Sequence, residues 1–197
     1  MKKLSISLLL LATVSFVGMA SVNPVDGEVD IAKSKVNWEG KKVTGKHHGS
    51  IDLKEASLEM KDGMLTGGSF TIDMTSIKNI DMAGKDGAPK LEGHLKSPDF
   101  FNVAEYPTAT LQITDVVSRG TEGEYKVVGD LTIKGITKPI KFNAHIGKED
   151  GMHMASANIE IDRAEYDVRY GSGSFFDGLA DKTIYDEFTL DVKLVLK

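Results

Sequence analysis

The stretch "EFTLDVKLVL", residues 187–196, alternates apolar and polar side chains along its length. Successive side chains of a β-strand point to opposite faces, so a period of two gives one apolar face and one polar face. Phe188, Leu190 and Val192 share the apolar face. The stretch therefore predicts a half-buried strand that packs one side against a core and turns the other side toward water.

The same alternation recurs along most of the chain. It is found in "VDIAKSKVNWEG" (29–40), "GGSFTIDMTSI" (67–77), "TATLQITDVV" (108–117), "VVGDLTIKG" (127–135), "PIKFNAHI" (139–146) and "ASANIEI" (155–161). Two of these strand regions contain a local irregularity. Lys33-Ser34 predicts a turn inside the first run, and the parity slip between Met154 and Ala155 predicts a β-bulge.

Turn residues and one short helical pattern divide these runs. Glycine-containing turns are expected at residues 61–63, 120–123, 134–135 and 150–151, and the last three are spaced for hairpins. Leu91 and Leu95 lie four residues apart in "GKDGAPKLEGHLK" (84–96), which predicts one short helix near residues 86–96. The fold class is therefore all-β, with about eight to ten strands and almost no helix.

Two architectures satisfy this pattern: a two-sheet sandwich and a closed antiparallel barrel. Both bury the same side chains, so periodicity alone does not choose between them. A closed barrel leaves no exposed strand edge, which helps a secreted protein to avoid aggregation by strand addition.

The first twenty residues have the pattern of a secretory signal peptide. Lys2 and Lys3 precede an apolar run at residues 4–17, and Gly18-Met19-Ala20 places small residues before a cleavage site. The apolar run is shorter than the roughly 20 residues of a membrane-spanning helix. We expect cleavage near Ala20, one domain at residues 21–197 without a membrane span, and a periplasmic or secreted location.

Composition excludes several classes of function. The chain has no cysteine, so disulfides, cysteine nucleophiles and cysteine metal ligands are excluded. Loss of Lys2 and Lys3 takes the formal net charge from −5 to −7, and no cluster of basic residues indicates nucleic-acid binding. The sequence predicts no cofactor.

Candidate catalytic and metal-binding motifs are weak. His47 and His48 are adjacent, and adjacent strand residues point to opposite faces, so exposed polar side chains are the preferred interpretation. "GSGSF" (171–175) lacks the strand–helix context of a hydrolase nucleophile. Asp177 and Asp181 belong to an acidic segment without calcium-loop spacing. No catalytic residue and no metal ligand are predicted.

Three segments resemble those of a known family. "HLKSPDFFNVAEYPTATL" (94–111) closely resembles the signature segment of the YceI-like polyisoprenoid-binding family. "VVGDLTIKGITKPIKF" (127–142) and "ANIEIDRAEYDVRYGSG" (157–173) resemble its next two segments, in the same order. Tyr166 stands where the family often has Phe, and Asp167 where Gly is common. The likeness covers essentially the whole chain after the signal peptide.

The resemblance implies an extended lipocalin-like antiparallel β-barrel that holds a long isoprenoid or fatty-acyl chain, in the periplasm or outside the cell, without catalytic residues. Strand parity selects the inward residues, and the irregular segments contribute aromatic pairs for the mouth of the barrel. The inward residues are Phe70, Ile72, Leu111, Ile113, Leu131, Ile133, Phe142 and Phe188. The mouth residues are Phe100, Phe101, Phe175 and Phe176.

Two other functions remain open on the sequence. One is a secreted protein-interaction or stress-response module with a filled core and no lipid ligand. The other is an enzyme that acts on an isoprenoid or glycan through the acidic C-terminal loop, with Asp177 and Asp181 as candidates. The sequence also leaves open whether the protein forms a homodimer.

Overall fold

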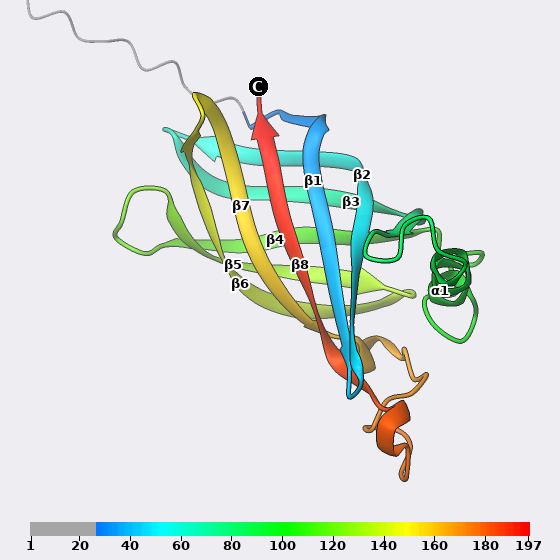
Figure 1. Ribbon diagram of the computed structural model, residues 1–197. Helices are drawn as coiled ribbons and strands as arrows, with labels where there is room; N and C mark the ends of the chain where they lie inside the picture. Colours follow the sequence, from blue (N-terminus) through cyan, green and yellow to red (C-terminus); the bar gives the residue numbers. More distant parts are fainter. Residues whose placement is uncertain (1–26) are drawn as a thin grey trace, which may run out of the picture.

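Eight antiparallel strands follow one another around a closed barrel in chain order (Figure 1). The computed structural model describes residues 27–197, so the predicted signal peptide lies outside the described residues. The strands are β1 (Val29–Lys42), β2 (Gly45–Lys61), β3 (Met64–Asn79), β4 (Thr108–Ser118), β5 (Glu124–Ile133), β6 (Ile136–Glu149), β7 (Met152–Asp162) and β8 (Ile184–Leu196).

Closure comes from the first and last strands, because β1 pairs with β8 as well as with β2. This confirms the all-β antiparallel barrel and decides between the barrel and the sandwich. The pairing of β2 with β3 contains three register shifts, between Ser50 and Asp52, between Leu53 and Glu55, and between Glu59 and Met60. Bulges of this kind bend a strand and increase its twist, so the first half of β2 pairs with β1 and the second half with β3.

The predicted tight turns are confirmed between β2 and β3, β5 and β6, and β6 and β7. In each turn the second residue is a glycine at positive φ: 77° at Gly63, 73° at Gly135 and 79° at Gly151. The first residue also has positive φ, 50° at Lys134 for example. Two successive positive φ angles match the right-handed twist of the flanking strands, which is why this turn type dominates short hairpins.

Two local predictions are wrong. Residues Lys33 and Ser34 lie within β1, where the register with β8 shifts, and they do not form a turn between strands. The Ser34 hydroxyl accepts a hydrogen bond from the Val195 amide at 3.0 Å, which replaces the missing backbone partner. The register of β7 is continuous through Met154 and Ala155, so no bulge forms there.

The predicted short helix is confirmed as α1 (Gly87–Lys96), which packs against the end of β3. In an antiparallel barrel with strands in chain order, every second strand-to-strand connection lies at the same end. α1, the segment 97–107, the β1–β2 turn and the β7–β8 connection therefore share one end, which we call the mouth (Figure 1). The β7–β8 connection contains two 3₁₀ turns, η1 (Arg163–Tyr166) and η2 (Ala180–Lys182).

No helix within residues 27–197 has the length and apolar character needed to cross a membrane.

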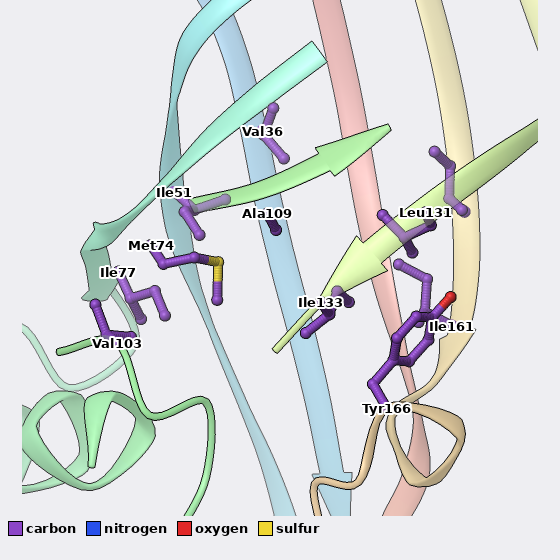
Figure 2. Packing of buried hydrophobic residues seen from close by; sticks show 11 residues of the cluster. Val36, Ile51, Met74, Ile77, Val103, Ala109, Leu131, Ile133, Ile161 and Tyr166 are labelled. Carbon is purple, nitrogen blue, oxygen red and sulfur yellow. The ribbon is translucent and has the colours of Figure 1, made fainter. Parts of the chain in front are cut away.

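The core occupies the barrel interior in two clusters, one toward the mouth and one toward the opposite end. Figure 2 shows the first cluster, in which Met74 and Ile77 of β3 meet Val103 of the segment 97–107, and Ile161 of β7 lies beside Tyr166 of η1. The non-helical segments at the mouth thus contribute side chains to the same core as the strands. They place apolar groups at the mouth of the barrel.

Candidate functional site

An apolar cavity of about 280 Å³ lies inside the barrel near the mouth. We call it the outer cavity. Strand residues of inward parity form its wall, and α1 and the segment 97–107 cover one side of it. The apolar strand residues that line it are Val36, Trp38, Ile51, Ile72, Met74, Ile77, Ala109, Leu131, Ile133, Ile161, Ile184, Phe188 and Leu190.

A second apolar cavity of about 100 Å³, the inner cavity, lies deeper in the barrel. Its wall includes Phe70, Leu111, Ile113 and Phe142. The two cavities adjoin, because five residues line both. These shared residues, which we call the waist, are Val36, Ile72, Leu131, Ile161 and Leu190. The barrel therefore contains two adjoining apolar spaces, one near the mouth and one deeper, on the two sides of the waist.

Adjacent Phe100 and Phe101 both line the outer cavity. Their ring centroids lie 5.7 Å apart, and the Phe101 ring lies 6.3 Å from that of Phe188 on β8. Alternation does not apply here because the chain forms turns. The amide of Phe100 donates to the carbonyl oxygen of Ser97 and that of Phe101 to Leu95, at the end of α1. Turn geometry thus places two neighbouring aromatic rings on the same side of the chain.

Arg163 anchors the aromatic wall from the other side. Its guanidinium carbon lies 5.3 Å from the centre of the Phe100 ring, and the side chain is only 3% exposed. Nη2 lies 3.1 Å from Oδ1 of Asp186, and burial lowers the pKa of Arg163 while the carboxylates of Asp186 and Asp162 oppose that effect. A buried charge of this kind persists only when it is paired and hydrogen-bonded.

The same guanidinium ties together the two ends of the β7–β8 connection. It donates to the carbonyl oxygens of Val168 at 2.7 Å, Ile184 at 3.1 Å and Tyr185 at 3.2 Å. The carboxylate of Asp186 accepts hydrogen bonds from the hydroxyls of Ser172 and Ser174 at 2.9 and 2.6 Å. This polar network therefore holds the connection against the mouth.

A second carboxylate holds the β1–β2 hairpin to the end of β3. Asp81 accepts from the His48 amide at 2.9 Å and from Asn79 Nδ2 at 2.6 Å, and its Oδ2 lies 2.9 Å from His47 Nδ1. Burial would raise the pKa of Asp81, but the hydrogen bonds from His47, His48 and Asn79 outweigh it and hold that pKa well below its usual range. The ring of His47 also lines the outer cavity.

The structure brings most of the predicted site residues together around the two cavities. The outer cavity is lined by Ile72, Phe100, Phe101, Leu131, Ile133 and Phe188. The inner cavity is lined by Phe70, Ile72, Leu111, Ile113, Leu131 and Phe142. Phe175 and Phe176 line neither cavity: they are 39% and 50% exposed, and Phe175 packs under the Arg169 guanidinium at 5.0 Å.

Other residues at the site were not selected from the sequence. Val36, Trp38 and Met74 share the alternation of the chosen residues, so strand parity was the signal that could have identified them. No sequence signal predicts the burial of Arg163, because strand parity does not indicate which distant carboxylate an arginine will pair with. Asp177 and Asp181 are exposed on the β7–β8 connection. Within residues 27–197 no group of three or more potential metal ligands is found.

Comparison with known proteins supports the resemblance. A model of the YceI-like domain matches residues 28–196. A UPF0312 protein of Vibrio cholerae is 32% identical over 143 residues, which span 67% of this chain and 72% of the relative. The protein YceI of Escherichia coli O157:H7 is 47% identical over 83 residues, 42% of this chain and 39% of that protein.

Solved structures show the same fold at low sequence identity. BcnA of Burkholderia cenocepacia superimposes with a TM-score of 0.70 at 23% identity, over 86% of this chain and 100% of that one. A polyisoprenoid binding domain from Saccharophagus degradans superimposes with a TM-score of 0.63 at 16% identity, over 86% and 96% of the two chains. From the family model, the relatives and the shared barrel it follows that this chain belongs to the YceI-like family.

Proposed function

We propose that the protein binds one long-chain apolar lipid in the barrel and carries or sequesters it. Polyisoprenoids, isoprenoid quinones and fatty-acid derivatives are the candidate ligands. The observation that carries the proposal is the pair of apolar cavities inside the barrel, the outer one near the mouth and the inner one deeper, which adjoin at the waist. Each CH₂ group moved from water into such a space contributes about 0.8 kcal/mol, so an alkyl or prenyl chain binds there without any polar contact.

The interior of the barrel also argues against the two alternatives. A protein-interaction module with a filled core does not need the outer cavity of about 280 Å³. For an enzyme, the polar groups at this cavity would have to be available for chemistry. Arg163 and His47 are engaged by Asp186 and Asp81, in contacts that hold the mouth together, and no carboxylate side chain within residues 27–197 lines the cavity. Binding without catalysis is therefore the function that we propose.

Two further observations support a lipid carrier. The related fold from Saccharophagus degradans is a polyisoprenoid binding domain. The basic and apolar pattern of residues 1–20 predicts export, which would place the protein between or outside membranes, where a long-chain lipid needs a shield from water. Our proposal thus places the protein in the periplasm or outside the cell.

Native mass spectrometry of the protein purified from its own periplasm tests this function. We expect a lipid-bound mass beside the bare chain, and one class of lipid in the organic extract. Ala109→Phe should lower lipid occupancy, because Ala109 is buried and lines the outer cavity, where the added ring would take up space. Ala32→Phe is the matched control, since Ala32 is exposed on β1. A bare mass, an extract without lipid and no uptake of added polyprenyl lipid would together refute the proposal.

A further inference from the structure

Basic side chains gather at the outer cavity. Those that line it are Lys41, Lys42, Lys46, His47, His94 and Arg163, whereas no carboxylate side chain among residues 27–197 lines it. The whole chain carries a formal net charge of −5, whereas the charged side chains at this cavity are all basic. A local excess of one sign of charge attracts ligands of the opposite sign.

Strand register separates these lysines into two groups. Val36 of β1 is 3% exposed, and its partner across the ladder is Ile51 of β2. Alternation carries the inward face along β1 to Lys42 at the rim. Lys41 has the opposite parity, and its partner across the ladder is Lys46. Lys42 thus shares the parity of the inward residues, and its exposed side chain lines the rim of the cavity together with those of Lys41 and Lys46.

Ion pairs separate the same two groups. The ammonium groups of Lys41 and Lys46 lie 3.4 and 2.8 Å from the carboxylate of Glu39. Lys42, in contrast, has no carboxylate partner within 4.0 Å in the described part of the chain. Of the three hairpin lysines that line the cavity, Lys42 is therefore the one whose charge is not balanced by a neighbouring carboxylate.

The remaining bases are engaged elsewhere. His47 Nδ1 lies 2.9 Å from the carboxylate of Asp81. Arg163 forms an ion pair with Asp186 at 3.1 Å, and its hydrogen bonds go to backbone carbonyl oxygens. The His94 ring packs edge-on against Tyr170, with ring centroids 4.3 Å apart. All three bases line the same outer cavity as Lys42, which leaves Lys42 as the cation there without an ion pair or an aromatic contact in the described part of the chain.

We infer that the ligand is an anionic amphiphile, whose carboxylate or phosphate head group pairs with Lys42 at the mouth while its chain occupies the cavities. The inference rests on the proposed lipid-binding function and specifies its ligand class. A charged head group stays at the mouth because transfer of an ion into the apolar interior is strongly unfavourable. The head group therefore sets the orientation of the ligand, and the chain supplies most of the affinity.

Trp38 provides a direct measurement, because it is the single tryptophan of the chain and lines the outer cavity. Titrations of its fluorescence should compare dodecanoate, dodecyl phosphate and dodecanol, which share one chain length. We expect the two anions to bind about two- to fivefold more tightly than the alcohol, as for an ion pair exposed to solvent at low salt. Higher ionic strength should reduce this preference.

Variants assign the preference to one residue. Lys42→Gln should remove it and leave dodecanol affinity unchanged, and Lys42→Arg should retain it. Lys35→Gln is the matched control, because Lys35 is exposed on the outer parity of the same strand and loses the same charge. A preference that survives Lys42→Gln, or one that Lys35→Gln also removes, would overturn the assignment to Lys42.

The outcomes also distinguish this inference from the function on which it rests. Equal affinities of the wild-type protein for the acid, the phosphate and the alcohol would refute the anionic head group and leave lipid binding intact. Failure of all three to bind would refute lipid binding itself. Inorganic phosphate should not displace dodecyl phosphate at equal concentration; displacement would identify a site for free anions and overturn the inference.

Discussion

At the scale of single residues, Tyr166 and Asp167 are two positions at which this chain differs from residues common in its family, and the structure shows the conformation and burial of each. Asp167 has φ of 58°, in the left-handed region that glycine adopts without steric cost, which explains why the family commonly has Gly there. Tyr166 is 1% exposed, and its hydroxyl has no protein partner within hydrogen-bond distance among the described residues. A phenylalanine ring would fill the same apolar position.

We therefore expect Tyr166→Phe to keep or raise the free energy of unfolding, by up to about 2 kcal/mol, because it removes a buried hydroxyl without a protein partner. Burial raises the pKa of Tyr166 to about 12 from 10.0. Ionisation of this phenol therefore does not affect the free energy of unfolding below pH 10, and it lowers that free energy as the pH rises from 10 toward 12, because the unfolded chain ionises first. Urea unfolding at pH 7 and pH 11 should show a smaller alkaline loss in the variant. An equal loss in both proteins would contradict this account.

At the scale of elements, Arg163 decides whether the β7–β8 connection stays on the barrel. Arg163→Gln leaves the nearly buried carboxylate of Asp186 without its cation, and we expect a loss of about 3–5 kcal/mol in the free energy of unfolding. Chemical denaturation measures the loss, and limited proteolysis should show faster cleavage within residues 170–182. Arg169→Gln is the control, because the Arg169 side chain is 59% exposed and its loss should cost less than about 1 kcal/mol.

The β1–β2 hairpin depends on the charge of Asp81 in a similar way. Hydrogen bonds from His47, His48 and Asn79 hold the pKa of Asp81 below its ordinary 3.8, against the effect of burial. The ionised carboxylate thus stabilises the fold above pH 3.8, and this contribution declines as the pH falls below that value. Asp81→Asn should be less stable than wild type at pH 7 by about 1–3 kcal/mol.

The two proteins should then converge as the pH falls. Urea unfolding at pH 7, 4 and 3 measures the difference in free energy of unfolding between wild type and Asp81→Asn. We expect this difference to narrow below pH 4. Asp130→Asn serves as control, because Asp130 is exposed on β5 and has no ion pair among residues 27–197. A difference between wild type and Asp81→Asn that stays constant down to pH 3 would show that the hairpin does not depend on the Asp81 charge.

At the scale of the whole molecule, cavity volume sets the length of chain that the barrel can hold. At about 30 Å³ for a water-sized group, the outer cavity of about 280 Å³ and the inner cavity of about 100 Å³ hold on the order of nine and three methylene-sized groups. A forty-carbon chain exceeds this space. Its binding requires side chains of the waist, such as Leu131, to rotate or part of the chain to remain outside.

We therefore expect affinity to rise about fourfold for each added CH₂, from 0.8 kcal/mol per group, up to roughly twelve carbons, and to rise more slowly beyond. A series of alcohols and carboxylates from eight to twenty carbons, followed through Trp38 fluorescence, measures this dependence. Leu131→Ala should move the break to longer chains, whereas Val117→Ala, at a 52% exposed position, should not. A constant increment up to twenty carbons would show that the barrel widens freely.

The sequence by itself determined which side chains face inward along the strands, because alternation is a local property of the extended chain. Leu131 and Phe142 of adjacent strands line the cavities as their parity predicted. The glycine-containing turns and the short helix could be predicted from the sequence for the same reason, since each depends on a few consecutive residues. The three family segments added the barrel that alternation alone left open.

Only the tertiary structure decided what depends on distant parts of the chain meeting. Bulges in β2 and the pairing of β1 with β8 close the barrel, the space that the strands leave unfilled forms the cavities, and Arg163 meets Asp186 across the β7–β8 connection. Phe175 and Phe176 resemble Phe100 and Phe101 in sequence but lie outside both cavities. The physical reason is that local pattern specifies the direction of a side chain, whereas a cavity or an ion pair depends on distances between elements.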